Sequence, residues 1–423
     1  MPEDTFLSDE FVRQLSAVGE VDVLVGIPTS NNRLTVQRVA QAVQIGLVKY
    51  FPRERTVVIN PDGGSRDGTP ELLMSASVQD FRSMLAANPL RTTHTLTTRY
   101  HPDLGQGAAL RLILAAADLL RAKACAVVSA DSATMTPEWI EALLRPIYRE
   151  GYDFLAPVYQ RHKFDALLVK NLLSPLIDVI YGTNFEEPAG TEFGFSGALA
   201  CHFLSQGVWR EDFLQYGSGI WMTTTALAGG YRPCQSFLGP KVRSIKLTEQ
   251  NLAGAIKQVV GALFHSLEAH QNFWLGRTES RPAPLFGFRP ELDLGPVRMN
   301  RKRLFEMFRT GVEELSAILG QLLSAPTFAQ VREVAATSEN PCHFPDELWA
   351  KTIYEFAVSY HRSVMNRDHL LQALTPIYRG RVCSYASENH AARIEELYQR
   401  TAALHEQFQR LRPDFVQNWS ART

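Results

Sequence analysis

The residues best suited to chemistry in this chain are polar side chains that follow short apolar segments. Asp131 lies just beyond the apolar run at residues 124–128, with Ser129 two positions before it. Mg²⁺ and Mn²⁺ prefer oxygen ligands, and water and substrate phosphates commonly complete their coordination. One carboxylate and one hydroxyl could hold such an ion if a diphosphate supplied further oxygens. The alternative is that Asp131 forms a turn or caps the next helix.

Two glycine-containing loops carry residues that could bind phosphate or a nucleotide. Residues 63–69 form a turn-rich loop after an apolar run, and Asp62 at its start could accept hydrogen bonds from a uracil or ribose edge. Residues 105–107 precede an alanine-rich segment and could bring backbone amides to a phosphate at a helix N-terminus. A capped turn and a plain helix entry are the respective alternatives, and both stay open.

A basic cluster at residues 160–165 could bind an anionic ligand. The planar guanidinium of Arg161 matches the geometry of a carboxylate or phosphate. A solvated loop is the alternative. His265 and His270 are five positions apart, which does not place them on one helix face, so they are not predicted to bind metal.

The elements that must position these residues alternate between strands and helices. We predict strands at residues 22–27, 56–60, 94–100, 124–128 and 152–159, with helices at residues 35–50, from about 70, 107–120 and 138–149. This alternation is typical of an α/β fold with a mostly parallel sheet covered by helices on both faces. In such sheets ligands bind at the carboxyl ends of the strands, where residues 28–32, 62–67 and 129–131 fall.

The pattern changes in the second half of the chain, where helical periodicity dominates. A proline-rich connector at residues 277–296 separates a long helical stretch from a region that is helical from residue 301 onwards. We therefore predict an N-terminal extension at residues 1–20, an α/β domain at residues 21–275 and an all-helical C-terminal domain at residues 276–423. Apolar faces of the helical domain could form a homodimer or pack within the chain.

Composition narrows the possible functions. The 423 residues are 45% hydrophobic and carry 43 basic against 44 acidic side chains, so nothing favours binding to nucleic acid or to an anionic membrane. The five cysteines are widely spaced, which favours reduced thiols over a disulfide framework. The sequence shows neither a signal peptide nor an apolar run long enough to span a membrane. These features predict a cytoplasmic protein.

Taken in order, the segments resemble retaining GT-A glycosyltransferases of the mannosylglycerate, glucosylglycerate and glucosyl-3-phosphoglycerate synthase group. The matching segments are residues 26–32, 62–69, 105–111, 129–139, 187–197, 216–221 and 239–243, together with Arg161, Asp165 and residues 348–350 and 368–381. The resemblance implies a GT-A nucleotide-diphospho-sugar transferase domain. It also implies transfer of a hexose from a UDP-glucose or GDP-mannose type donor to a small acidic acceptor such as glycerate or phosphoglycerate.

The resemblance assigns roles to named residues. Catalytic residues would be Asp131, Arg161, Glu192 and Arg243. Donor-binding residues would be Pro28, Thr29, Ser30, Asn32, Asp62, Ser65, Gln106, Ser129, Ala130, Asp131 and Lys241. The acceptor would bind to Arg161, Gly190, Thr191 and Glu192. Asp131 would be the ligand of an Mg²⁺ or Mn²⁺ ion, if one binds.

Several positions depart from the pattern of this group. Gln106 stands where lysine is usual, Ser129 where aspartate is usual, and Gly219 where an acidic residue is usual; Arg243 replaces a metal-binding histidine, and Asn32 occupies an often acidic position. Two hypotheses follow. The first is an active transferase with little or no metal dependence, in which Arg243 and Lys241 stabilise the leaving diphosphate. The second is a catalytically impaired relative that acts as a binding or regulatory protein.

Overall fold

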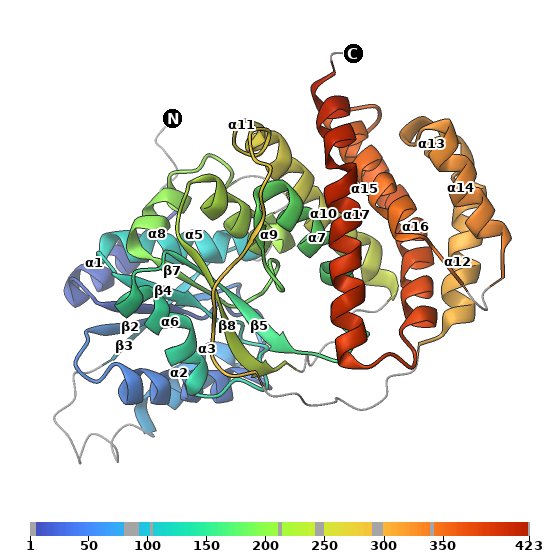
Figure 1. Cartoon of the computed structure of the whole chain (residues 1–423). Helices are drawn as coiled ribbons and strands as arrows, with labels where there is room; N and C mark the ends of the chain where they lie inside the picture. Colours follow the sequence, from blue (N-terminus) through green and yellow to red (C-terminus); the bar gives the residue numbers. More distant parts are fainter. Residues whose placement is uncertain are drawn as a thin grey trace. The chain divides into compact units, whose positions relative to one another are not determined.

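The computed structural model describes residues 6–79, 93–101, 105–209, 214–241, 249–289, 299–338 and 342–421. Internal contacts divide the chain into two compact units (Figure 1). The sheet unit comprises Met1–Gln160, Glu187–Lys246 and Ala283–Glu291, and the helical unit comprises Arg161–Glu186, Leu247–Pro282 and Leu292–Thr423. No helix in the described part of the chain is both long and apolar enough to cross a membrane.

The sheet unit is built on an eight-stranded, mostly parallel sheet. Its strands are β1 (Val23–Gly26), β2 (Thr56–Asp62), β3 (His94–Arg99), β4 (Ala124–Val127), β5 (Phe154–Gln160), β7 (Phe193–Ser196), β8 (Pro233–Pro240) and β10 (Leu285–Phe286). Their order across the sheet is β10-β8-β5-β7-β4-β1-β2-β3, and only β7 pairs antiparallel with its two neighbours. The predicted α/β class with a mostly parallel sheet is confirmed.

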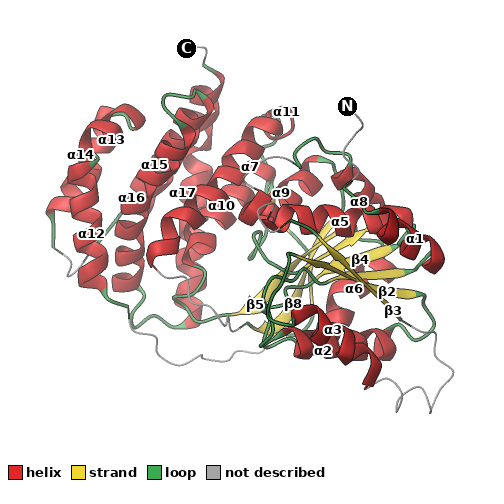
Figure 2. Ribbon diagram, turned by 180° about the vertical axis from the view of Figure 1, so that it is seen from behind, coloured by secondary structure: helices red, strands yellow, loops and turns green. Residues whose placement is uncertain are grey.

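The central strands are buried on both faces because helices cover both sides of the sheet. Every residue of β1, β2, β4 and β5 is buried, as expected for apolar strands without polar alternation. On one face lie α2 (Val36–Tyr50), α3 (Thr69–Gln79) and α6 (Glu138–Glu150); on the other lie α1 (Asp9–Val18), α5 (Gly105–Leu119), α8 (Gly197–Leu204) and α9 (Leu214–Ala228) (Figure 2). The sheet is therefore the middle layer of three.

Close packing on this scaffold requires glycine at the end of β1. A Cβ atom at Gly26 would collide with the Ile113 side chain of α5. Gly26 also pairs with Ile59 of β2 and Val127 of β4, so the strand cannot move away from the helix without breaking the sheet. This contact fixes the level at which the loop after β1 leaves the sheet.

The helical unit consists of packed helices and a short two-stranded pairing. Its elements are η2 (Val169–Leu173), a π-helix, with α7 (Ser174–Tyr181), β6 (Thr183–Asn184), α10 (Glu249–Ala269), α11 (Gln271–Trp274), β9 (Arg281–Pro282), α12 (Arg301–Glu314), α13 (Ser316–Leu322), α14 (Ala325–Ala336), α15 (Asp346–His361), α16 (Arg367–Glu388) and α17 (Ile394–Ser420). Aromatic stacking of Phe415 on Tyr354 and Trp274 holds α17 against α15 and α11. The predicted helical C-terminal region is confirmed.

The two units are not contiguous in sequence, unlike the predicted domains. Residues 161–186 and 247–275 fall within the predicted α/β domain at residues 21–275, yet their contacts place them in the helical unit. The reason is packing: α7 contacts α17, and α10 contacts α15 and α16. Helix α1, within the predicted N-terminal extension, belongs to the sheet unit. The domain boundaries stay a prediction.

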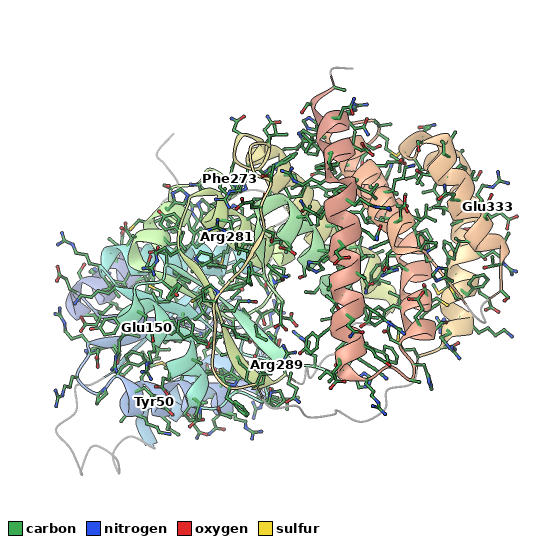
Figure 3. All side chains as sticks on the ribbon, viewed as in Figure 1. Tyr50, Glu150, Phe273, Arg281, Arg289 and Glu333 are labelled. Atoms are coloured by element: carbon green, nitrogen blue, oxygen red, sulfur yellow. The ribbon has the colours of Figure 1, made fainter. Side chains whose placement is uncertain are left out.

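Charged side chains project from the outer surface of each unit (Figure 3). Glu150 at the end of α6 and Glu333 in α14 are examples, and both are exposed.

Candidate active site

Loops from separate parts of the chain meet at the carboxyl edge of the parallel strands. Strands β1, β2 and β4 are neighbours in the sheet, and β5 pairs in parallel with β8. The segments after them begin at Ile27, Gly63, Val128, Arg161 and Lys241. The segments that begin at Ile27, Gly63, Val128 and Lys241 belong to the sheet unit. Arg161 is the first residue of the helical unit. The sequence therefore correctly predicts that residues 28–32, 62–67 and 129–131 share one edge.

Asp62 holds the first two of these loops together. Its carboxylate is fully buried and accepts hydrogen bonds from Thr29 Oγ1 at 2.8 Å, Ser65 Oγ at 2.6 Å and the Ser65 backbone amide at 2.9 Å. Main-chain hydrogen bonds also join Thr29 to Pro61 and Gly63. The side chain of Asp62 thus has a structural task in this state, and its predicted contact with a donor stays a prediction.

Further hydrogen bonds connect the tips of the same two loops. Asn31, in the left-handed region at φ 55°, donates its backbone amide to Ser65 Oγ, and its side chain accepts from the Arg66 amide at 3.0 Å. Asparagine tolerates this conformation better than most residues. Asp67 accepts from the Thr69 hydroxyl and from the Arg33 amide, and these bonds lower the pKa of Asp67. The result is a preformed pair of loops with exposed backbone.

Asp131 interacts with Asn32 across the edge. Asn32 Nδ2 donates to Asp131 Oδ1 at 2.6 Å, while Asn32 Oδ1 accepts from the Ser30 amide at 2.6 Å. Ser129 Oγ accepts from the Asp131 amide at 3.3 Å. An acidic residue at position 32 would place two carboxylates together, which a bound cation would have to offset. The neutral amide makes the pair with Asp131 stable without such an ion.

The described residues provide a poor set of ligands for a divalent ion. Within the described ranges, no three His, Cys, Asp or Glu side chains are grouped so that they could hold a metal. Asp131 Oδ1 faces an amide NH₂ group, and Ser129 Oγ faces a backbone N–H. These side chains alone therefore do not form a site for a divalent metal ion. The role of Asp131 as a metal ligand stays a prediction that depends on oxygens from a substrate.

A buried ionic network lies beside this edge, centred on Glu192. Glu192 is fully buried, and its two carboxylate oxygens contact Ser132 on one side and Tyr159 and Lys241 on the other. Thr191 Oγ1 donates to Glu192 at 2.9 Å. Lys241 Nζ, whose side chain is only 4% exposed, also contacts Thr191 Oγ1 at 2.6 Å and Tyr159 Oη at 3.2 Å. The network joins the loops after β4 and β8 to β5 and to the segment before β7.

The charge state of this network follows from its partners. Burial alone would raise the pKa of Glu192, but the adjacent Lys241 ammonium and the hydroxyl donors outweigh it and hold that pKa at about 2. Glu192 is therefore a permanent carboxylate without solvent access and is unsuited to proton transfer. Lys241 is neutralised by the same pair. Both residues position the Gly190–Thr191 segment; their predicted catalytic and donor-binding roles stay predictions.

Close backbone packing surrounds the predicted acceptor loop. A Cβ atom at Gly190 would collide with the ring of Pro157. A Cβ atom at Gly219, in α9, would lie 2.8 Å from the Gly190 carbonyl oxygen and 3.0 Å from the Phe193 ring. The acidic side chain expected at position 219 from the resemblance has no space here. Gly219 is thus matched to the packing of this chain.

The remaining predicted site residues differ in how they are placed. Gln106 is exposed in the first turn of α5; at the edge, Ser30 is exposed, Pro28 is partly buried and Ala130 is buried. Arg243 lies outside the described residues. The sequence analysis did not identify Ser132 or Tyr159, which complete the buried network. Tyr159 ends a predicted strand and Ser132 follows Asp131, so strand-end position was the available signal for both.

Comparisons with known proteins give structural matches. No family model and no curated protein sequence matches the chain. Glucosyl-3-phosphoglycerate synthase from Mycobacterium tuberculosis in complex with phosphoglyceric acid matches with a TM-score of 0.42 and 16% identity, covering 62% of this chain and 85% of that chain. The same enzyme with Mg²⁺ and uridine diphosphate matches with a TM-score of 0.43 and 17% identity, covering 60% and 83%.

Proposed function

We propose that this protein is a retaining glycosyltransferase that moves a hexose from a nucleotide-diphosphate sugar to a small acidic acceptor. The observation that carries the proposal is the convergence of four sequence segments at one sheet edge. Residues 26–32, 62–69, 129–139 and 187–197 each resemble this group of enzymes, and the fold brings them to the carboxyl ends of β1, β2 and β4 and to the adjoining segment before β7. Open α/β sheets bind ligands at this edge.

The donor would lie along the paired loops after β1 and β2. Asp62 and Asn31 fix the two loops relative to each other, so the conformation of the loops is set before a ligand arrives. Asp131 would face the diphosphate, with Asn32 holding the carboxylate in one orientation. A carboxylate beside a diphosphate needs a cation to offset the repulsion, and a cation held in a fixed position would stabilise the charge that develops on the leaving group.

The acceptor would lie near Gly190 and Thr191, where the buried network fixes the backbone. Thr191 donates to Glu192, and Lys241 contacts both residues. Front-face attack within an oxocarbenium-like ion pair, with the leaving diphosphate taking the acceptor's proton, is what the resemblance implies. Such a reaction requires no protein carboxylate as a base, which agrees with the low pKa of Glu192.

The leaving diphosphate needs positive charge that Lys241 does not provide. The Lys241 ammonium is buried in its pair with Glu192, and the pair as a whole carries no net charge. In the metal-independent hypothesis, Arg243 supplies this positive charge. In the metal-dependent hypothesis, a divalent ion held jointly by Asp131 and the diphosphate supplies it. The two hypotheses differ in whether donor binding requires a divalent ion, which a binding experiment measures.

Isothermal titration calorimetry tests the proposal. UDP-glucose and GDP-mannose are titrated into the protein with Mn²⁺ and again with a chelator, followed by turnover assays with glycerate and 3-phosphoglycerate. Binding of one donor followed by release of its nucleoside diphosphate would support the proposal. If neither UDP-glucose nor GDP-mannose bound, the proposal would be overturned. Loss of binding in chelator would exclude the metal-independent version.

A binding protein without turnover is the second candidate, and Gly219 favours it. The structure leaves no space for an acidic side chain at this position, so the fold has adapted to its absence. Donor binding with no turnover of either acceptor would favour this second function. Turnover comparable to that of ordinary transferases, on the order of 1–1,000 per second, would exclude it.

A further inference from the structure

The residues that follow β1, β2 and β3 form a row at the carboxyl edge of the sheet. Strands β2 and β3 pair in parallel up to their last residues, so Gly63 and Tyr100, which follow them, lie opposite each other. On the other side of β2, Thr29 forms a bridge with Asp62, which places Ser30 beside Gly63. The middle position of this row therefore has no side chain.

The side chain of Tyr100 fills the space above Gly63. A Cβ atom at Gly63 would lie 3.0 Å from Tyr100 Oη, 3.1 Å from Tyr100 Cζ and 3.4 Å from Ser30 Cβ. Gly63 does not have a positive φ angle, unlike Gly64 at φ 75°, so its backbone conformation does not require glycine. Glycine is needed for space instead, because the phenol occupies the volume of a side chain at position 63. The Tyr100 ring thus reaches from β3 across β2 towards the loop after β1.

Both the ring and the hydroxyl of Tyr100 have open positions. Within the described ranges, the Tyr100 hydroxyl has no hydrogen-bond partner, and no aromatic ring or cation lies over the Tyr100 ring. The residue is only partly buried, and its oxygen is not cut off from solvent. Burial and then the negative charge of Asp62 raise the pKa of Tyr100, so the phenol is a protonated donor at neutral pH. An aromatic surface and a hydrogen-bond donor are therefore available at this edge.

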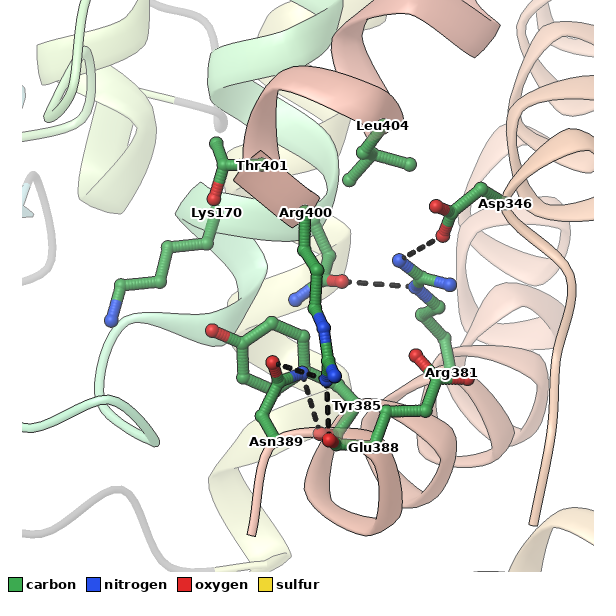
Figure 4. A pocket seen from close by; sticks show the side chains of 10 residues that line it. Lys170, Asp346, Arg381, Tyr385, Glu388, Asn389, Arg400, Thr401 and Leu404 are labelled. Atoms are coloured by element: carbon green, nitrogen blue, oxygen red, sulfur yellow. Dashed lines mark hydrogen bonds and ion pairs between the residues drawn. The ribbon is translucent and has the colours of Figure 1, made fainter. Parts of the chain in front are cut away.

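Polar side chains around the small cavity of the helical unit provide a contrast (Figure 4). There Arg381 pairs with Asp346 at 2.6 Å, and Arg400 donates to the Glu388 carbonyl. These lining groups bind one another or nearby carbonyls. Tyr100 differs from them, because its polar group is open and lies at the sheet edge where the donor is proposed to bind.

A nucleobase is the part of a nucleotide sugar that matches the two features of Tyr100. Its planar ring system stacks on aromatic side chains, and a carbonyl oxygen of uracil or guanine accepts a hydrogen bond from a phenol. The loops at residues 27–33, 62–69 and 128–132 contain no aromatic residue. Tyr100 is thus the aromatic side chain that the structure places against these loops.

We propose that Tyr100 binds the nucleobase of the donor, with its ring as the stacking surface and its hydroxyl as the donor to a base carbonyl. This inference rests on the function proposed above, because it requires a nucleotide at this edge. Asp131 follows β4, three strands away from β3 in the sheet, which is about 14 Å at the usual spacing of ~4.8 Å. The base and the diphosphate would therefore occupy two different parts of the edge.

Isothermal titration calorimetry of the full-length protein with Mn²⁺ tests this role. The probes are UDP, GDP and ribose 5-diphosphate, which has no base and is measured by displacement of the bound nucleotide. For the nucleotide that binds more tightly, we expect Tyr100→Phe to weaken binding roughly fivefold, the usual effect of losing one neutral hydrogen bond. Tyr100→Ala should weaken it at least about tenfold, because stacking is lost as well. Both variants should bind ribose 5-diphosphate as the unmodified protein does.

Tyr231→Phe is the matched control. Tyr231 is another partly buried tyrosine of the sheet unit, and burial also raises its pKa. It comes shortly before β8 and therefore lies at the amino edge of the sheet, away from the proposed donor site. The control variant should bind all three probes with unchanged affinity.

The outcomes separate this inference from the proposed function. If neither UDP nor GDP binds, the proposed function fails and the role of Tyr100 fails with it. If one of them binds equally well to the unmodified protein and to both Tyr100 variants, only the role of Tyr100 is overturned. Equal weakening of ribose 5-diphosphate would also overturn it, because the substitutions would then act through the loops. Tyr100→Phe keeps the ring above Gly63, so it provides a folded variant if Tyr100→Ala does not fold.

Discussion

At the scale of single residues, the polar groups at the sheet edge divide into those that hold the structure and those open to a ligand. Glu192, Lys241 and Asp62 are buried and have their hydrogen-bonding capacity taken up by neighbours. Asp131 is partly exposed, and among the described residues its side chain has one partner, Asn32. Sequence reasoning placed all four in one site, because residue type does not reveal which carboxylates are already paired.

Removal of one partner of the buried Glu192–Lys241 pair should strongly destabilise the fold. Lys241→Met would leave a buried carboxylate without its counter-charge, and we expect a loss of about 3–5 kcal/mol in the free energy of unfolding. Urea denaturation measures this loss. The control is Lys123→Met, whose exposed pair with Asp22 should be worth less than about 1 kcal/mol. Equal effects of the two substitutions would show that the buried pair is not formed.

The same pair predicts how stability depends on pH. Because the folded-state pKa of Glu192 is depressed from 4.5 to about 2, its contribution is fully present above pH 4.5 and is lost as pH falls towards 2. Glu192→Gln removes this titration. The stability difference between the unmodified protein and Glu192→Gln should therefore shrink as the pH is lowered from 5 to 3. A difference that stays constant over that interval would contradict the assigned pKa.

Asn32 should determine whether the edge needs a cation. Asn32→Asp replaces the amide beside Asp131 with a second carboxylate, which would repel it unless a divalent ion lies between them. We expect this variant to melt at a lower temperature in chelator and to recover with Mn²⁺. Thermal unfolding with and without the ion measures the effect. A Mn²⁺ response equal to that of the unmodified protein would argue against this role for Asn32.

At the scale of elements, the sequence predicted the first five strands of the sheet and did not predict β7, β8 or β10. Strands β1, β2 and β4 are apolar throughout and are bounded by clear turn residues, so periodicity and length identified them. Strand β7 has four residues and pairs antiparallel between β4 and β5, far from its neighbours in sequence. Such a pairing depends on tertiary contacts that local sequence does not encode.

Helix α9 provides a test at this scale through Gly219. Gly219→Ala would place its Cβ atom 2.8 Å from the Gly190 carbonyl oxygen, so we expect a loss of about 1–3 kcal/mol from overpacking. Gly254→Ala in α10 is the control, since a Cβ atom there meets nothing within 4 Å and should stabilise the helix by up to about 1 kcal/mol. Chemical denaturation compares the two variants, and stabilisation by both would contradict the close packing of α9.

At the scale of the whole molecule, two compact units are interleaved along the chain. Composition and periodicity predicted an α/β region followed by a helical one, and both are present. The assignment of residues 161–186 and 247–275 to the helical unit was not predicted, because it depends on contacts of α7 with α17 and of α10 with α15 and α16 that local sequence does not encode.

The central claim is that a nucleotide sugar binds at the carboxyl edge of the parallel sheet. Hydrogen–deuterium exchange, measured with and without saturating UDP-glucose or GDP-mannose, tests it most directly. The account predicts that one donor protects backbone amides at residues 27–33, 62–69 and 128–132 and leaves α12 to α14 unchanged. Absence of protection at these three segments with both donors would contradict it.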